Sequence, residues 1–333
     1  KETSELENLL KEVSRRKHAI TVNSCTDALY FSLRAAGIGV HDEVIVPALS
    51  FIATASPVVR AGAKPVFADV LPDGNIDLNE ARKKITSRTK GIIPVHLYGR
   101  MSNPDEITRF VNDTGLIVIE DAAQALGSSC NGIPAGKTGF CSCFSFDPSK
   151  IIGAFGTGGA VLTDDDIVAE KIRSWRAQGK DTTTGTFSEP GYNSRLSTLQ
   201  AALVLMQMKE MKHIIAERNR IASEYNRHLN GLPLNILQTP AGTDCWNYHK
   251  YPLFTPLRNE LKKFLAEKEI ETQIHYPYLL SGQPVFGSPQ DVFPVAANIS
   301  QQTLSLPVYP ELSSGEIGYV CNSVQEFFKK QSI

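Results

Sequence analysis

Short apolar runs alternate with helical patterns through the first two-thirds of the chain, and this alternation most limits the possible folds. The strand-like runs occupy residues 18–23, 42–47, 64–70, 91–99 and 116–121. Helical patterns follow them over residues 26–38, 51–61, 77–85 and after Pro104. Five such steps in about 120 residues predict an α/β fold, with a mostly parallel central sheet flanked by helices on both faces.

The middle of the chain predicts the end of this sheet and a long helical region. CSCFSF (141–146) and GGAVLT (158–163) are typical of neighbouring strands, and the loop between them carries Lys150. After Ser197 the pattern becomes helical over some thirty residues. We expect its apolar stripe to consist of Leu199, Leu203, Met206 and Ile214.

A glycine- and proline-containing segment, residues 231–244, interrupts the helical pattern. Beyond it, a strand-like YHKYPLF, a helix over 257–268 and a further strand-like run predict a smaller α+β unit. We therefore predict a large domain over residues 1–228 and a small C-terminal domain over residues 229–333.

Composition argues against several classes of partner. The 34 lysines and arginines nearly balance the 35 aspartates and glutamates, so no nucleic-acid partner is predicted. No apolar stretch approaches the roughly 20 residues that span a bilayer, so no membrane association is predicted. The six cysteines lack the spacing of a metal site, and we expect free thiols in a reducing cytoplasm. The chain starts at Lys1, from which we expect it to begin inside a longer protein.

Polar residues follow the strand-like runs, where parallel sheets bind ligands. NSCTDA (23–28) places serine, threonine and aspartate at the start of a helix. Free backbone N–H groups and the helix dipole at such a turn bind anions, most naturally a phosphate. The same residue types are also the preferred helix caps, so this stretch alone leaves both interpretations open.

Asp121 ends the strand-like run LIVIED, and Gln124 follows it within EDAAQA. A carboxylate in this position caps the next turn, binds a ribose, or pairs with a cationic nitrogen of a ligand. Gln124 would lie on the same side if the turn is helical.

Lys150 lies between an aromatic run and the glycines of GAFGTGG. Neither a Walker motif nor a dinucleotide fingerprint is present, which argues against nucleotide hydrolysis and nicotinamide chemistry. Composition alone favours an unreactive surface lysine, whereas a lysine in a cleft becomes a nucleophile towards carbonyls. Together, the phosphate turn, the carboxylate, the glutamine and this lysine are the groups that hold pyridoxal phosphate.

The motifs EDAAQA, SF-x(3)-K and G-x-N-S-R-L occur in this order at residues 120–125, 145–150 and 191–196. With NSCTDAL, AGAKPVFADV and ETQIHYP, they resemble the DegT/DnrJ/EryC1/StrS sugar aminotransferases over nearly the whole chain. The resemblance implies the aspartate-aminotransferase fold (fold type I), a pyridoxal 5'-phosphate cofactor and no metal.

For the cofactor ring, the resemblance implies one role for each of four residues. Lys150 would bind the cofactor aldehyde and move the proton, and Asp121 would keep the pyridine nitrogen protonated. Gln124 would lie beside the ring hydroxyl, and Phe51 would stack on the ring.

For the phosphate and the substrate, the implied residues come from three segments. Thr26 and Asp27 would offer backbone N–H groups to the phosphate, with help from Ser145. Asn193 would reach the phosphate from the partner subunit, which implies a homodimer. Arg195 and His275 would belong to the substrate pocket.

The resemblance implies an enzyme that transfers the amino group of L-glutamate to a nucleotide-linked keto-sugar. Such amino-sugars go into surface polysaccharides or glycosylated metabolites. A dehydratase-type or cyclitol aminotransferase relative, or a non-catalytic homologue, remains an alternative. The chain departs from the family at Cys25, where members commonly have glycine, and cysteine would be strained if that position needs a positive φ.

Overall fold

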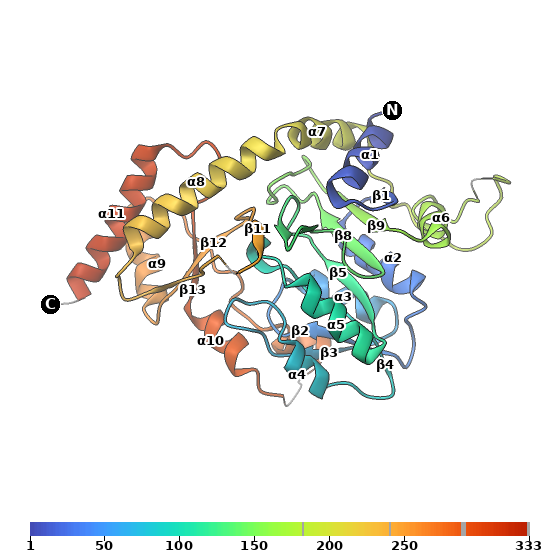
Figure 1. Cartoon of the computed structure of the whole chain (residues 1–333), viewed down its shortest axis with the longest axis horizontal. Helices are drawn as coiled ribbons and strands as arrows, with labels where there is room; N and C mark the ends of the chain where they lie inside the picture. Colours follow the sequence, from blue (N-terminus) through green and yellow to red (C-terminus); the bar gives the residue numbers. More distant parts are fainter. Residues whose placement is uncertain (182, 240, 288–290, 332–333) are drawn as a thin grey trace.

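The structure is a computed structural model that describes residues 1–181, 183–239, 241–287 and 291–331. Its centre is a seven-stranded sheet in the order β1-β9-β8-β5-β4-β2-β3 (Figure 1). The strands of this sheet are β1 (His18–Val22), β2 (Glu43–Pro47), β3 (Lys64–Ala68), β4 (Thr89–Ile92), β5 (Ile117–Asp121), β8 (Cys141–Ser145) and β9 (Gly159–Thr163). The α-helices of the N-terminal two-thirds are α1 (Glu2–Ser14), α2 (Cys25–Ala35), α3 (Ser56–Arg60), α4 (Leu78–Lys83), α5 (Pro104–Thr114), α6 (Asp166–Trp175), α7 (Thr198–Lys209) and α8 (Met211–Leu229).

The strand directions bring the predicted site segments to one edge of the sheet. β9 runs antiparallel to both of its neighbours, β8 and β1, whereas the other neighbouring strands pair in parallel. The carboxyl ends of β1, β2, β5 and β8 therefore lie at the same edge. Asp121 pairs with Cys143 in register, and Ser145 pairs with Gly159.

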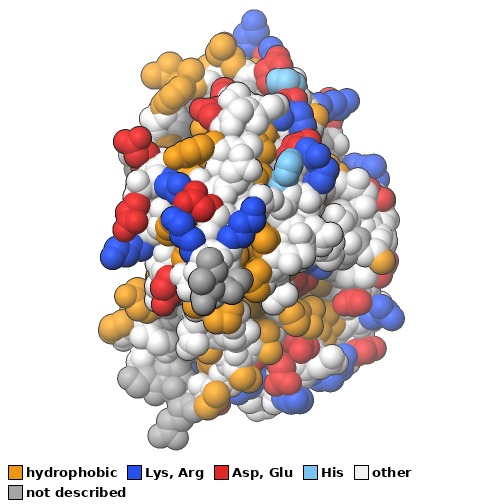
Figure 2. Space-filling view, turned by 90° about the vertical axis from the view of Figure 1, so that its left-hand side faces the viewer, with side chains coloured by type: hydrophobic (Ala, Val, Ile, Leu, Met, Phe, Trp, Pro, Cys, Tyr) orange, Lys and Arg blue, Asp and Glu red, His pale blue; other side chains and the backbone are white. Residues whose placement is uncertain are grey.

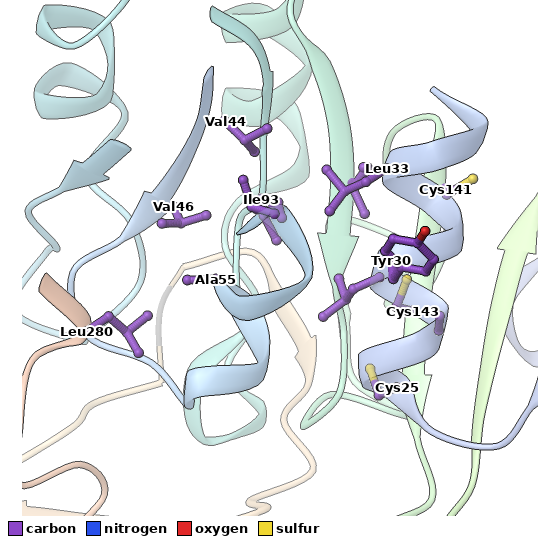
Figure 3. Packing of buried hydrophobic residues seen from close by; sticks show 14 of the residues in the cluster. Cys25, Tyr30, Leu33, Val44, Val46, Ala55, Ile93, Cys141, Cys143 and Leu280 are labelled. Carbon is purple, nitrogen blue, oxygen red and sulfur yellow. The ribbon is translucent and has the colours of Figure 1, made fainter. Parts of the chain in front are cut away.

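Alternate residues of the buried strands point into separate apolar layers, which explains the near-continuous apolar runs of the sequence. On β9, Val161 belongs to the layer that also contains buried residues of α2 and α6. Its neighbours Ala160 and Leu162 belong to the opposite layer, with α1 and α7. Figure 3 shows part of the first layer, where Cys25 and Tyr30 of α2 lie close to Cys143 of β8.

The C-terminal third forms a smaller sheet with its own apolar cluster. Its strands are β10 (Asn235–Ile236), β12 (Tyr251–Phe254) and β13 (Thr303–Leu306), and its helices include α9 (Arg258–Glu267), α10 (Pro294–Gln302) and α11 (Ser314–Gln331). A third small sheet joins β6 (Ser129–Cys130), β7 (Ile133–Pro134) and β11 (Thr243–Cys245). The long helix α8 runs from the large sheet to the C-terminal part (Figure 1). Its residues from Ile221 onward already belong to the C-terminal cluster. The boundary at residue 228 stays a prediction.

The predicted apolar stripe after Ser197 is wrong. Leu199 and Met206 are 68% and 67% exposed, whereas Val204 and Met208 are buried. Helix α7 carries apolar residues on all of its sides, so the periodicity of the sequence could not identify the side that faces the core. The helix also ends at Lys209, and α8 begins separately at Met211.

Two predicted elements are shorter than expected. The strand predicted over 91–99 ends at Ile92, two residues before Pro94, which has no N–H to donate to a neighbouring strand. The helix predicted over 51–61 is instead a 3₁₀ turn at Ile52–Thr54 followed by α3.

The surface shows no concentration of one charge on the face seen in Figure 2, where basic, acidic and apolar side chains are interspersed. Within the described ranges, no helix combines the length and the apolar character needed to cross a bilayer. The six cysteines, all described, are free thiols.

Candidate active site

A cavity of about 360 Å³ lies at the carboxyl edge of the large sheet. It brings together most of the predicted site residues from segments that are far apart in the sequence. Those that line it are Thr26, Phe51, Asp121, Gln124, Ser145, Lys150 and His275. A larger cavity of about 690 Å³, lined by Asp73, Arg82 and Arg109 among others, contains none of them.

The start of α2 forms one end of this cavity. Ser24 caps the helix, and its hydroxyl oxygen accepts a hydrogen bond of 3.1 Å from the N–H of Asp27. The N–H groups of Cys25 and Thr26 have no hydrogen-bond partner among the described residues. Two free donors at the positive end of an eleven-residue helix suit a phosphate.

The side chain of Asp27 forms its contacts outside the cavity. Its carboxylate forms an ion pair of 2.7 Å with Arg60 and accepts a hydrogen bond of 2.6 Å from the Ser194 hydroxyl. It is not among the residues that line the cavity. Asp27 therefore holds the turn in place, while Cys25, which sequence reasoning did not assign to the phosphate, contributes a free N–H.

Cys25 is not strained by its position. It is the first residue of α2 and is absent from the residues with positive φ. The residue that requires glycine here is Gly159, since a Cβ atom on it would lie 2.5 Å from the backbone nitrogen of Cys25. Gly159 thus allows β9 to pass close to the phosphate turn.

Asp121 is buried at the end of β5, in the floor of the cavity. Burial raises the pKa of its carboxyl, while hydrogen bonds from the Thr54 hydroxyl and the Ala123 N–H act in the opposite direction. The Thr54 bond measures 2.8 Å, and the Thr54 hydroxyl is also 2.8 Å from that of Ser50. A buried carboxylate of this kind gains stability from a cationic partner, such as a protonated ring nitrogen.

Thr54 was not predicted as a site residue, and its contact suggests a test. We expect Thr54→Val to slow amine transfer by about tenfold, because Asp121 loses the donor that favours its charged form. Ser50→Ala, which keeps the Thr54–Asp121 bond, should have a smaller effect. Stopped-flow measurement of each half-reaction would compare the two variants, and equal rates in Thr54→Val and the wild type would contradict this role.

Gln124 is held in one orientation. Its Oε1 accepts a hydrogen bond of 2.8 Å from the N–H of Tyr98, which turns its Nε2 towards the Tyr276 hydroxyl at 3.3 Å. Phe51 lies at the opening of the cavity, is 54% exposed, and has its ring centre 6.0 Å from that of Tyr276. The cavity thus has an oriented amide donor and two aromatic rings around the space above Asp121.

Lys150 extends from the loop between β8 and β9 into the same cavity. Burial lowers the pKa of its amine, although Cys25, Asp121 and Asp147 act in the opposite direction. Lowering of this kind increases the fraction of neutral, nucleophilic amine. Together with the donors at α2 and the carboxylate of Asp121, this set of groups fits pyridoxal phosphate.

Asn193 and Arg195 lie apart from this group. Both are exposed and line a different, shallow cavity with Arg176. The segment is nevertheless fixed to the phosphate turn, because the N–H of Asn23 donates to the Ser194 carbonyl at 2.9 Å.

Comparison with known proteins identifies the family. The model of the DegT/DnrJ/EryC1/StrS aminotransferase family matches residues 1–325. The chain belongs to this family. Membership confirms the predicted aminotransferase activity and the predicted dependence on pyridoxal phosphate.

Two relatives and one solved structure show how close the similarity is. A pleiotropic regulatory protein of Geobacillus stearothermophilus is 40% identical, over 97% of this chain and 88% of its own. The UDP-2-acetamido-2-deoxy-3-oxo-D-glucuronate aminotransferase of Pseudomonas aeruginosa is 36% identical, over 96% of this chain and 89% of its own. The structure of S. venezuelae DesV in complex with a ketimine intermediate superposes with a TM-score of 0.95 at 35% identity, over 99% of this chain and 90% of its own. The predicted fold is confirmed.

Proposed function

We propose that this aminotransferase moves an amino group from L-glutamate to the ketone carbon of a nucleotide-linked sugar. The observation that carries the proposal is the meeting of Lys150, Asp121 and the free N–H groups of α2 in one cavity. The similarity to the P. aeruginosa enzyme, which is named for a UDP-linked keto-sugar, supports the substrate class.

When bound, pyridoxal phosphate supplies an aldehyde and an electron-withdrawing ring that stabilises negative charge on the reacting carbon. Thr26 and Cys25 would bind the phosphate through their N–H groups, and the Ser145 hydroxyl would add a donor. Asp121 would hold the proton on the ring nitrogen. Gln124 would donate its amide N–H to the ring hydroxyl.

Lys150 would act twice. Its neutral amine would first hold the cofactor aldehyde. The same amine, once displaced by the amino donor, would take the proton from the donor α-carbon and deliver it to the former aldehyde carbon of the cofactor. Burial lowers the pKa of this amine, which favours the neutral form that the exchange needs. The amino group is then passed to the second substrate in a separate half-reaction, so we expect ping-pong kinetics.

We further propose a homodimer in which Asn193 of the partner subunit completes each phosphate site. Asn193 and Arg195 are exposed and outside the cavity of their own subunit, where a second copy can reach them. Such a contact would also cover exposed apolar side chains, for which Phe155, Leu199 and Met206 are candidates.

The shared site can be tested by mixing variants. We expect Asn193→Ala to raise the dissociation constant of the cofactor about tenfold, since it removes one hydrogen-bond donor to a charged group. Asn193→Ala mixed and refolded with Lys150→Ala should regain activity beyond the sum of the two, because hybrid dimers contain one native site. Strictly additive activity, with hybrids verified by mass spectrometry, would rule out the shared site.

The product would be an amino-sugar still attached to its nucleotide, and hence an activated glycosyl donor. We propose that it is made in the cytoplasm and used for surface polysaccharides, lipopolysaccharide among them, or for glycosylated metabolites. Arg195 and His275 are proposed to contact the substrate.

A regulatory function is the second candidate, because the G. stearothermophilus relative is named for one. Titration of the cofactor-loaded protein with L-glutamate distinguishes an aminotransferase from a regulatory protein. The enzyme should lose its visible absorbance and release one 2-oxoglutarate per site, and a panel of nucleotide-linked keto-sugars should then restore the absorbance. A protein that binds the cofactor and leaves glutamate unchanged would support regulation without catalysis.

A further inference from the structure

The cavity contains a group of polar residues that the cofactor does not require. The start of α2 serves the phosphate, and Asp121, Gln124 and Phe51 serve the ring. Four side chains line the cavity from the C-terminal third: Tyr276, which accepts a hydrogen bond from Gln124, and the three further residues His249, Lys250 and His275. They come from the segment before β12 and from the chain after α9.

Lys250 is a half-buried cation without a counter-ion. It immediately precedes β12, and it forms no ion pair with any carboxylate of the described ranges. Burial, reinforced by the nearby charges of Lys150 and Arg218, lowers its pKa to about 8, and only Asp147 acts in the opposite direction. A partly buried ammonium without a partner is unfavourable until an anion enters.

The two histidines beside it are neutral. Burial lowers the pKa of His249 well below its usual value and that of His275 to about 4. His249 is 3% exposed, and its Nδ1 has no hydrogen-bond partner among the residues that the structure describes. The Nδ1 of His275 lies 3.0 Å from the Ser305 hydroxyl. This wall of the cavity therefore combines one cation with two uncharged imidazoles, one of which has an unused, buried polar atom.

We infer that Lys250, with His249 and His275 beside it, forms a subsite for a substrate carboxylate, namely that of the amino donor. This inference rests on the proposed function and adds the residue that recognises the donor. Lys250 and Lys150 line the same cavity, so a ligand of Lys250 would be an anion close to the reacting carbon. An amino acid carries a carboxylate one bond from that carbon, whereas the diphosphate of a nucleotide-sugar lies across the sugar ring.

The test compares Lys250→Met, which keeps the length of the side chain without its charge, with Lys250→Arg, which keeps the charge. Lys212→Met, at an exposed lysine of α8, is the matched control. Binding of glutarate to the cofactor-loaded protein is measured by calorimetry, since glutarate carries the carboxylates of the donor without a reactive amine. Glucuronate and UDP are measured in parallel, because a sugar carboxylate or a diphosphate could supply the same charge.

Lys250→Met should weaken glutarate binding at least about tenfold and leave UDP binding unchanged, while Lys250→Arg retains most of the affinity. Lys212→Met should bind all three as the wild type does. Loss of glucuronate or UDP binding with glutarate unaffected would overturn the assignment to the donor. No change for any ligand would overturn the subsite itself. Failure of the proposed function would appear separately, as wild-type protein that releases no 2-oxoglutarate from glutamate.

Discussion

Lys150→Ala is expected to abolish amine transfer, with a rate at least about 10,000-fold below the wild type. The variant loses both the amine that holds the cofactor aldehyde and the base that moves the proton. We expect no other lysine to replace it. Among the described residues that line the cavity, the one further lysine is Lys250, which comes from the C-terminal third of the chain. The measurement is single-turnover formation of 2-oxoglutarate from L-glutamate.

A second measurement checks that the loss of activity results from the missing amine of Lys150. Treatment of the loaded wild-type protein with borohydride should fix the cofactor to the peptide that contains Lys150, and mass spectrometry should find no such adduct in Lys150→Ala. The exposed Lys212 offers a control, since Lys212→Ala should behave as the wild type does. An adduct on another lysine, or a variant that still turns over rapidly, would contradict the role of Lys150.

Asp121→Asn is expected to bind the cofactor and to transfer amine about 1,000-fold more slowly, a barrier increase of about 4 kcal/mol. The amide keeps the size of the side chain and can still accept from the Thr54 hydroxyl, but it carries no charge to hold the ring nitrogen protonated. The ring then stabilises less negative charge on the reacting carbon.

Kinetics and binding together test this role. The dissociation constant of the cofactor should change by a smaller factor than the rate, since the phosphate turn and Lys150 are untouched. Asp121→Glu keeps the charge but displaces it, and should recover part of the rate. Turnover in Asp121→Asn equal to that of the wild type would reject the role.

The sequence predicted the large sheet well because its strands are buried on both faces. The apolar run 18–23 corresponds to β1 and the run 42–47 to β2, each within one residue at either end. The polar residues that end these strands were therefore assigned to the correct edge. The prediction of the core-facing side failed at α7, because this helix carries apolar residues on all of its sides.

The contacts that sequence reasoning missed depend on tertiary structure. Thr54 reaches Asp121 across 67 positions of sequence, and Gln124 reaches Tyr276 across 152. No local sequence pattern predicts such contacts. His249 and Lys250 could have been noticed in YHKYP as polar residues beside a buried strand, but only the fold brings them into the same cavity as Lys150.

The proposed reaction transfers one amino group from glutamate to a nucleotide-linked sugar. The most direct measurement incubates the loaded protein with ¹⁵N-labelled L-glutamate and a panel of nucleotide-linked keto-sugars, and follows the label by mass spectrometry. We expect one ¹⁵N-labelled amino-sugar for each 2-oxoglutarate released, with neither product in Lys150→Ala. Release of 2-oxoglutarate without label in any sugar of the panel would contradict the proposed acceptor, and no release at all would contradict the aminotransferase mechanism.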